Sequence, residues 1–132
     1  WTVGVEHPDS KLSNRMATAA IKLDDKGMAG SGNYRKFRID ALTGKKFVHT
    51  LNPLTGAAEQ NNMTSATVVA NSCAEADAYA TACMALGFEA AKKMIEQTAG
   101  VEAYLTYIEK DTAAAVFVTE GFKYMMVDSL AF

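Results

Sequence analysis

The chain has 132 residues, of which 49% are hydrophobic and 21% are charged, as expected for one globular domain. Its formal net charge is −2, and it has no basic run, which argues against nucleic acid or an anionic membrane surface as a partner. No stretch approaches the ~20 apolar residues of a membrane span, and two Cys with two His cannot form a four-ligand zinc site of the usual spacing. Cys73 and Cys83 could pair, so cysteine usage leaves the redox compartment open.

The start of the sequence indicates a piece of a longer protein. The chain begins at Trp1 without a Met, and residues 2–5 already have the pattern of a strand. Residues 1–132 contain no internal repeat and no linker-like run, so they predict a single domain.

The first half of the chain predicts strands separated by turns. The apolar run at residues 16–23 ends at a turn-forming acidic segment before Gly27. Residues 34–40 alternate between apolar and polar side chains, and with residues 45–51 on the other side of Gly44 they predict a β-hairpin. In chain order, strands are expected at residues 16–23, 28–29, 34–40, 45–51 and 65–70.

A helical pair and three further strands follow. Ser72 and Glu75 have the spacing of a capping box, which marks a helix start. Helices are expected at residues 73–86 and 88–97, separated by Gly87, and strands at 101–108, 113–119 and 122–127, with a turn at Gly121. This order predicts an α+β fold with a mainly antiparallel sheet packed against the helical pair.

The first helix carries the most informative pattern. Residues 76–88 have side-chain oxygens only at Asp77, Tyr79 and Thr81, so we expect the helix to be buried on most sides. Asp77 and Thr81 share one helix face, and a carboxylate with a hydroxyl is an oxygen pair that Mg²⁺ accepts beside water and phosphate. Because this spacing is common in helices, spacing alone favours the structural alternative, in which Asp77 faces solvent or bonds a loop and Thr81 bonds back to its own helix.

Two loop segments are further candidates. Residues 27–34 (GMAGSGNY) could bring backbone amides close to an anion, or they could be a strand end that turns through small residues. Residues 49–56 (HTLNPLTG) predict a turn that holds His49 at a strand end. There His49 could act as a general acid or base or contact a phosphate, or it could be a structural hydrogen-bonding residue.

In this order the segments resemble those of the FAD:protein FMN transferase family, the ApbE-like proteins. The matching segments are residues 29–34, 49–56 and 76–82 (ADAYATA). Residues 1–5 are similar to the strand that opens the family's second half. The resemblance covers nearly the whole chain, but only the C-terminal portion of a family member.

The resemblance implies an α+β flavin-binding fold and Mg²⁺-dependent cleavage of FAD, with FMN transferred to a Thr or Ser of an acceptor subunit of a redox complex. Asp77 and Thr81 would then be the metal ligands, and His49 would lie at the reacting phosphates. The residues implied to bind the cofactor are Ser31, Gly32, Tyr34 and Thr55. The resemblance also implies a periplasmic or otherwise extracytoplasmic protein, held to the membrane only by a lipid anchor upstream of this chain.

Several departures from the family pattern leave other functions open. Gly30 stands where the family has Thr, Asn33 where Asp is frequent, and Leu54 where a basic residue is frequent. The family's N-terminal half would be a partner of these residues, so we expect the chain alone to bind FAD weakly or not at all. The alternatives are a non-catalytic flavin-binding module and an FAD pyrophosphatase that releases FMN and AMP. A flavin acceptor is disfavoured because Ala58 occupies the position of the modified hydroxyl residue.

Overall fold

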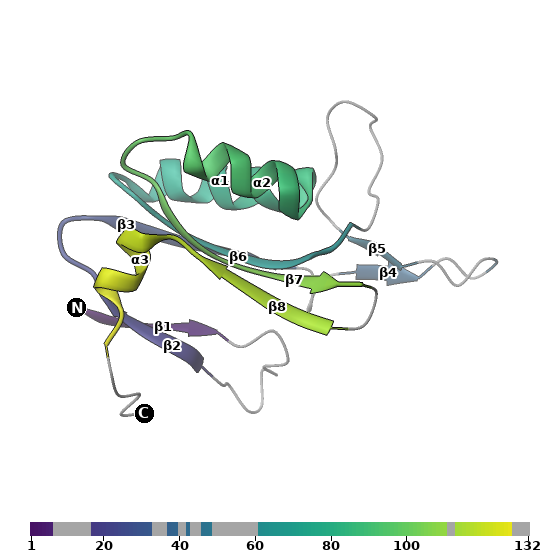
Figure 1. Ribbon diagram of the computed structural model, residues 1–132, viewed down its shortest axis with the longest axis horizontal. Coiled ribbons are helices and arrows are strands. Elements are labelled where there is room, and N and C mark those ends of the chain that lie inside the picture. The colour runs from purple at the N-terminus through teal and green to yellow at the C-terminus, as the bar shows by residue number, and fades with distance from the viewer. Residues whose placement is uncertain are drawn as a thin grey trace.

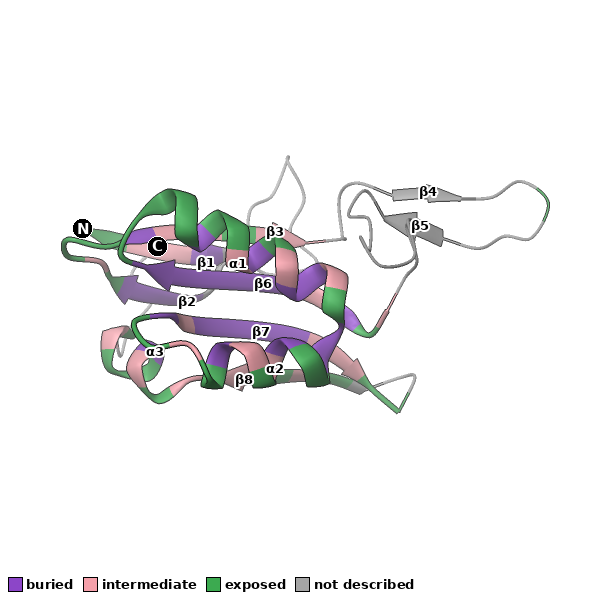
Figure 2. Cartoon of the chain, turned by 90° about the horizontal axis from the view of Figure 1, so that it is seen from above, coloured by how far each residue is buried: buried purple, intermediate pink, exposed green. Residues whose placement is uncertain are grey.

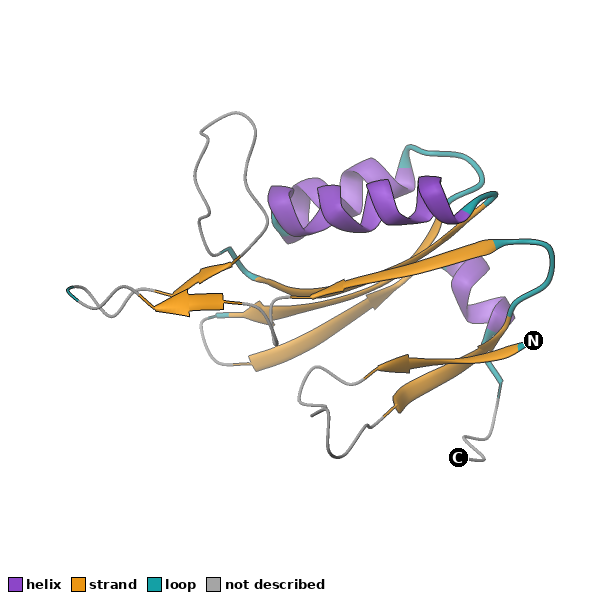
Figure 3. Ribbon diagram, turned by 180° about the vertical axis from the view of Figure 1, so that it is seen from behind, coloured by secondary structure: helices purple, strands orange, loops and turns teal. Residues whose placement is uncertain are grey.

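The computed structural model describes residues 1–6, 17–32, 37–39, 42, 46–48, 61–110 and 113–127. Figures 1 and 3 show these residues in layers around a four-stranded antiparallel sheet. The helical pair lies on one face, the helix face; a two-stranded sheet and a short helix lie on the other, the β1–β2 face. This arrangement confirms the predicted α+β fold with antiparallel pairing.

The four-stranded sheet has the order β3-β6-β7-β8, and every neighbouring pair is antiparallel. Its strands are β3 (Gly27–Gly32), β6 (Met63–Ala70), β7 (Glu102–Glu109) and β8 (Ala113–Val118). The helices are α1 (Cys73–Leu86), α2 (Phe88–Glu96) and α3 (Glu120–Met125). The two smaller sheets pair β1 (Thr2–Glu6) with β2 (Ala17–Lys22) and β4 (Phe37–Ile39) with β5 (Lys46–Val48). The β4–β5 pairing confirms the predicted hairpin.

Each face of the central sheet carries its own apolar core, because successive side chains of a strand point to opposite faces. On the helix face, Ala66, Val68 and Leu105 pack with buried residues of α1 and α2. On the β1–β2 face, Val69 and Tyr104 pack with residues of β1, β2 and α3. Strand β6, shown as buried along its length in Figure 2, therefore contributes to both cores.

The prediction of a last strand at residues 122–127 is wrong, since α3 occupies most of that range. Aromatic and β-branched residues favoured the strand, but the helix places Phe122 and Met125 on one side, where both join the β1–β2 core. Phe122 is fully buried, with its ring 5.7 Å from the Tyr104 ring between centroids. Only Met126 pairs as a strand residue, in a single bridge to Ile21.

The expectation that α1 is buried on most sides is also wrong for the part of the chain that is described. Its buried residues are Ala76, Ala80, Cys83 and Met84; the outer side is exposed, as Figure 2 shows. The pattern misled because alanines occur all round this helix, so composition did not distinguish its inner side from its outer side. Cys73 and Cys83 are both free thiols, and no helix among the described residues is long and apolar enough to span a membrane.

Two local features fix where α1 starts. The Ser72 hydroxyl accepts a hydrogen bond from the Glu75 amide at 3.2 Å, which confirms the predicted N-cap. Gly27 of β3 lies against the same turn: a Cβ built there would lie only 2.2 Å from the Cys73 nitrogen. The helix start is therefore held directly against the start of β3.

Candidate functional site

Asp77 and Thr81 lie on the exposed side of α1, one helical turn apart. Neither side chain hydrogen-bonds or forms an ion pair with another described residue, so Thr81 does not bond back to its helix as Thr98 does to the Met94 carbonyl at 2.7 Å. An exposed carboxylate and hydroxyl on one side of a helix fit Mg²⁺, which takes few protein oxygens and completes its octahedron with water and phosphate. Within the described ranges, no three His, Cys, Asp or Glu side chains form a metal-binding group.

The end of β3 that carries Ser31 lies level with Thr81. Helix α1 follows β6 after a tight turn and runs antiparallel to it. Because β3 is also antiparallel to β6, α1 and β3 run in the same direction. Eight helical residues from Cys73 to Thr81 rise ~12 Å, and four strand residues from Gly27 to Ser31 advance ~13 Å. The far end of α1 agrees with this register, because the Asn61 amide donates to the Met84 carbonyl beside the start of β6. The fold thus places two separate sequence motifs at the same height.

Ser31 also borders a small pocket on the β1–β2 face, which we call the hydroxyl pocket. Its volume is ≈ 150 Å³, and its lining comes from β1, β3 and β6. The described residues that line it are Gly4, Val5, Met28, Gly30, Ser31, Ser65 and Thr67. None of them is charged, and three carry hydroxyl groups.

Sequence reasoning missed the hydroxyl residues of β6 and β7. Ser65 and Thr67 are 7% and 8% exposed, and Ser65 hydrogen-bonds the hydroxyl of Thr106, which also bonds the Thr64 hydroxyl at 2.6 Å. The register of β6 against β7 shifts between Met63 and Ser65, and such bulges re-aim side chains. The signal available in the sequence was the alternation of Ser65 and Thr67 with apolar residues in a buried strand.

The remaining candidates lie outside the described residues. These are His49, the catalytic candidate, and Tyr34 and Thr55, two of the cofactor-binding candidates. Of the predicted site, the structure therefore places Asp77, Thr81, Ser31 and Gly32. It brings Asp77 and Thr81 together on α1 and places the other two at the end of β3.

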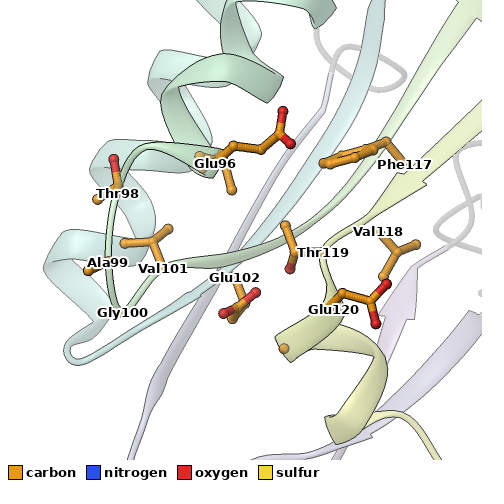
Figure 4. A pocket seen from close by; sticks show the side chains of 12 residues that line it. Glu96, Thr98, Ala99, Gly100, Val101, Glu102, Phe117, Val118, Thr119 and Glu120 are labelled. Carbon is orange, nitrogen blue, oxygen red and sulfur yellow. The ribbon is translucent and has the colours of Figure 1, made fainter.

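A larger pocket, of ≈ 450 Å³, lies toward the edge of the sheet that is opposite β3, between α2, β7 and the start of α3. Figure 4 shows Glu96, Glu102 and Glu120 around it, with Phe117 at its side. The Glu120 carboxylate already pairs with Lys123 at 3.3 Å. None of the candidate catalytic, cofactor-binding or metal-binding residues is among the described residues that line this pocket, so it is separate from the candidate site.

Comparisons with known proteins bear on the sequence as a whole. The sequence profile of the ApbE family matches residues 1–105. The FAD:protein FMN transferase of Escherichia coli strain K12 is 33% identical over 112 residues, which cover 85% of this chain and 30% of that protein. The Haemophilus influenzae protein of the same name is 34% identical over 97 residues, or 74% of this chain and 27% of that one. The chain thus spans about three tenths of the length of these relatives.

The fold is also found among solved structures. The apo form of the Pseudomonas stutzeri flavinyl transferase ApbE aligns with a TM-score of 0.74 and 26% identity, over 98% of this chain and 38% of that one. The family match covers most of the chain and agrees with the resemblance seen in the three motifs. The chain belongs to the ApbE family.

Proposed function

We propose that this chain forms part of an FAD:protein FMN transferase, in which Asp77 and Thr81 hold Mg²⁺ beside the pyrophosphate of FAD. The observation that carries the proposal is the pair of exposed oxygen side chains on α1, level with Ser31 and without another described partner. The names of the relatives from Escherichia coli and Haemophilus influenzae support the choice of substrate. An acceptor protein follows from the same activity.

The proposed reaction is a phosphoryl transfer. A Thr or Ser hydroxyl oxygen of the acceptor forms a bond to the phosphorus of the FMN moiety, the pyrophosphate bond breaks, and AMP leaves. When bound, Mg²⁺ supplies charge stabilisation at the phosphate oxygens. Asp77 and Thr81 hold the metal against the substrate, Ser31 and Gly32 with Tyr34 and Thr55 contact the cofactor, and His49 takes the hydroxyl proton. The extracytoplasmic location, the lipid anchor and the redox-complex acceptor remain predictions from the family resemblance.

A metal titration tests the ligand assignment. Mg²⁺ added to the chain should shift the amide NMR signals of Asp77 and Thr81, and Asp77→Asn should abolish these shifts. Because Asp77 is exposed, the substitution should change the free energy of unfolding by less than about 0.5 kcal/mol. Asp24→Asn, at an exposed turn position, is the matched control and should leave the shifts intact. Shifts that persist in Asp77→Asn contradict the assignment.

A transfer assay tests the activity. This chain replaces the matching region of the Escherichia coli relative, and the chimera is mixed with FAD, Mg²⁺ and a Thr-containing acceptor peptide. We expect release of AMP together with an increase in peptide mass equal to one FMN, both lost in Asp77→Asn. Release of AMP without labelled peptide would instead support an FAD pyrophosphatase. The absence of both products, or full activity in Asp77→Asn, contradicts the proposed function.

A further inference from the structure

Two consecutive asparagines tie the helical pair to the central sheet. Asn61 and Asn62 directly precede β6. The Asn61 amide donates to the Met84 carbonyl of α1 at 2.8 Å, and its Oδ1 accepts from the Met63 amide of β6 at 2.9 Å. The last four carbonyls of a helix have no partner within the helix. Asn61 therefore satisfies one of these groups and joins the end of α1 to the start of β6.

Asn62 forms the corresponding link to α2. Its Oδ1 accepts from the Phe88 amide at 2.9 Å, and its backbone carbonyl accepts from the Ile108 amide of β7 at 2.8 Å. Gly87, the N-cap residue of α2, provides no side-chain hydrogen bond, so Asn62 caps this helix from outside it. The two asparagines thus make similar bonds, one to each helix, and can be compared as a matched pair.

The core beneath α1 offers little resistance to a shift of the helix. Ala76 and Ala80 of α1 and Ala66 and Ala70 of β6 are all fully buried in it. Apolar burial is non-directional, and side chains as small as these form only shallow ridges that could interlock. Directional contacts at the two ends of α1 therefore fix where the helix lies on the sheet.

The bond at the end of α1 bears most directly on Thr81. The start of the helix is held against Gly27, so the movement that remains is a swing about that end. At a rise of ~1.5 Å per residue, Asp77 lies ~6 Å and Thr81 ~12 Å along the helix from Cys73, so a swing displaces Thr81 about twice as far as Asp77. Thr81 is also only three residues before Met84, whose carbonyl Asn61 holds.

We propose that Asn61 is a positioning residue for the metal site, which keeps Thr81 level with Ser31 by fixing the end of α1. This inference rests on the proposed function for the identity of the ligand, Mg²⁺. Asn61 contacts neither the metal nor the substrate in this proposal and acts only through its bond to the helix.

Metal titrations of two matched variants test this proposal. Asn61→Ala removes the side-chain bond to α1, and Asn62→Ala removes the side-chain bond to α2. Both should lower the urea midpoint by a similar amount, because each variant loses a bond that satisfies a helix end. Only Asn61→Ala should weaken Mg²⁺ binding, followed by the Asp77 amide NMR signal, by about 3- to 10-fold, the range that one net hydrogen bond can supply.

Spectra recorded without Mg²⁺ give a second readout. The Thr81 amide signal should shift in Asn61→Ala, by more than the Asp77 signal, and should stay in place in Asn62→Ala. Equal Mg²⁺ affinities in the two variants, or an unshifted Thr81 signal in Asn61→Ala, overturns the proposal. If the parent chain shows no Mg²⁺ shifts, or shifts that survive in Asp77→Asn, the proposed metal site fails, and the metal-free Thr81 signal alone then decides whether Asn61 positions Thr81.

Discussion

Replacing Gly27 by Ala should separate α1 from the strand beside it. A Cβ at this position would lie 2.2 Å from the Cys73 nitrogen and 2.3 Å from the Ser72 carbonyl carbon, more than an ångström short of the 3.4 Å at which ordinary contact begins. Both neighbours are backbone atoms of the α1 start, so no side chain can rotate away. We expect a loss of about 3 kcal/mol in the free energy of unfolding, the upper end of the usual cost of overpacking.

Gly30→Ala, three residues along the same strand, is the matched control. The nearest atom to a Cβ there is the Thr67 Oγ1 at 3.9 Å, an ordinary contact. Because Gly in a strand interior costs roughly 0.5–1 kcal/mol relative to Ala, this variant should be as stable as the parent or slightly more stable. Urea unfolding followed by circular dichroism, with unchanged slopes, measures both. Equal stabilities for the two variants would refute the close packing of β3 on α1 as the reason for glycine at position 27.

Three further predictions concern α1 itself. Ser72→Ala should lower the free energy of unfolding by about 1 kcal/mol through loss of the N-cap bond, and Ser72→Asp should restore it; an unchanged urea midpoint in Ser72→Ala would rule out that role. Cys83 is fully buried, and burial raises the pKa of its thiol from 9.0 to about 12. At pH 8 the native protein should therefore be alkylated at one thiol, that of Cys73, whereas the unfolded protein should be alkylated at both. Intact mass measures the number of alkyl groups. The unfolded chain loses the Cys83 proton at lower pH than the folded chain, so stability should fall between pH 9 and about 12, by at most about 1.4 kcal/mol per pH unit; Cys83→Ala should flatten this slope, and an identical slope would contradict it.

The parts of the fold that were predictable from the sequence depend on neighbouring residues. Ser72 and Glu75 define the start of α1 through one local bond, and Gly87, at φ +84°, separates the two helices as expected. The residues of α3 were misassigned because the helical state depends on a distant partner, the Tyr104 ring that packs against Phe122. No local pattern encodes that contact.

The candidate site follows the same division. The position of Asp77 and Thr81 on the same face of α1 depends only on helical spacing, so the sequence was enough to predict it. The hydroxyl pocket requires the register of three strands, since Gly30 faces Thr67 and Ser65 reaches Thr106 only in the observed pairing. Ser65 and Thr67 were therefore counted only as part of a β-branched strand, although their alternation with apolar residues already distinguished one face of it.

Strand β3 contacts the start of α1 on one face of the sheet and borders the hydroxyl pocket on the other. Gly27, the first residue of β3, allows the start of α1 to pack closely against the strand. This close packing sets the distance of Asp77 and Thr81 from the sheet. The later residues of β3, Gly30 and Ser31, border the hydroxyl pocket on the opposite face. The close approach of α1 therefore explains the glycine at position 27, whereas a Cβ at Gly30 would meet only the Thr67 Oγ1 at an ordinary 3.9 Å.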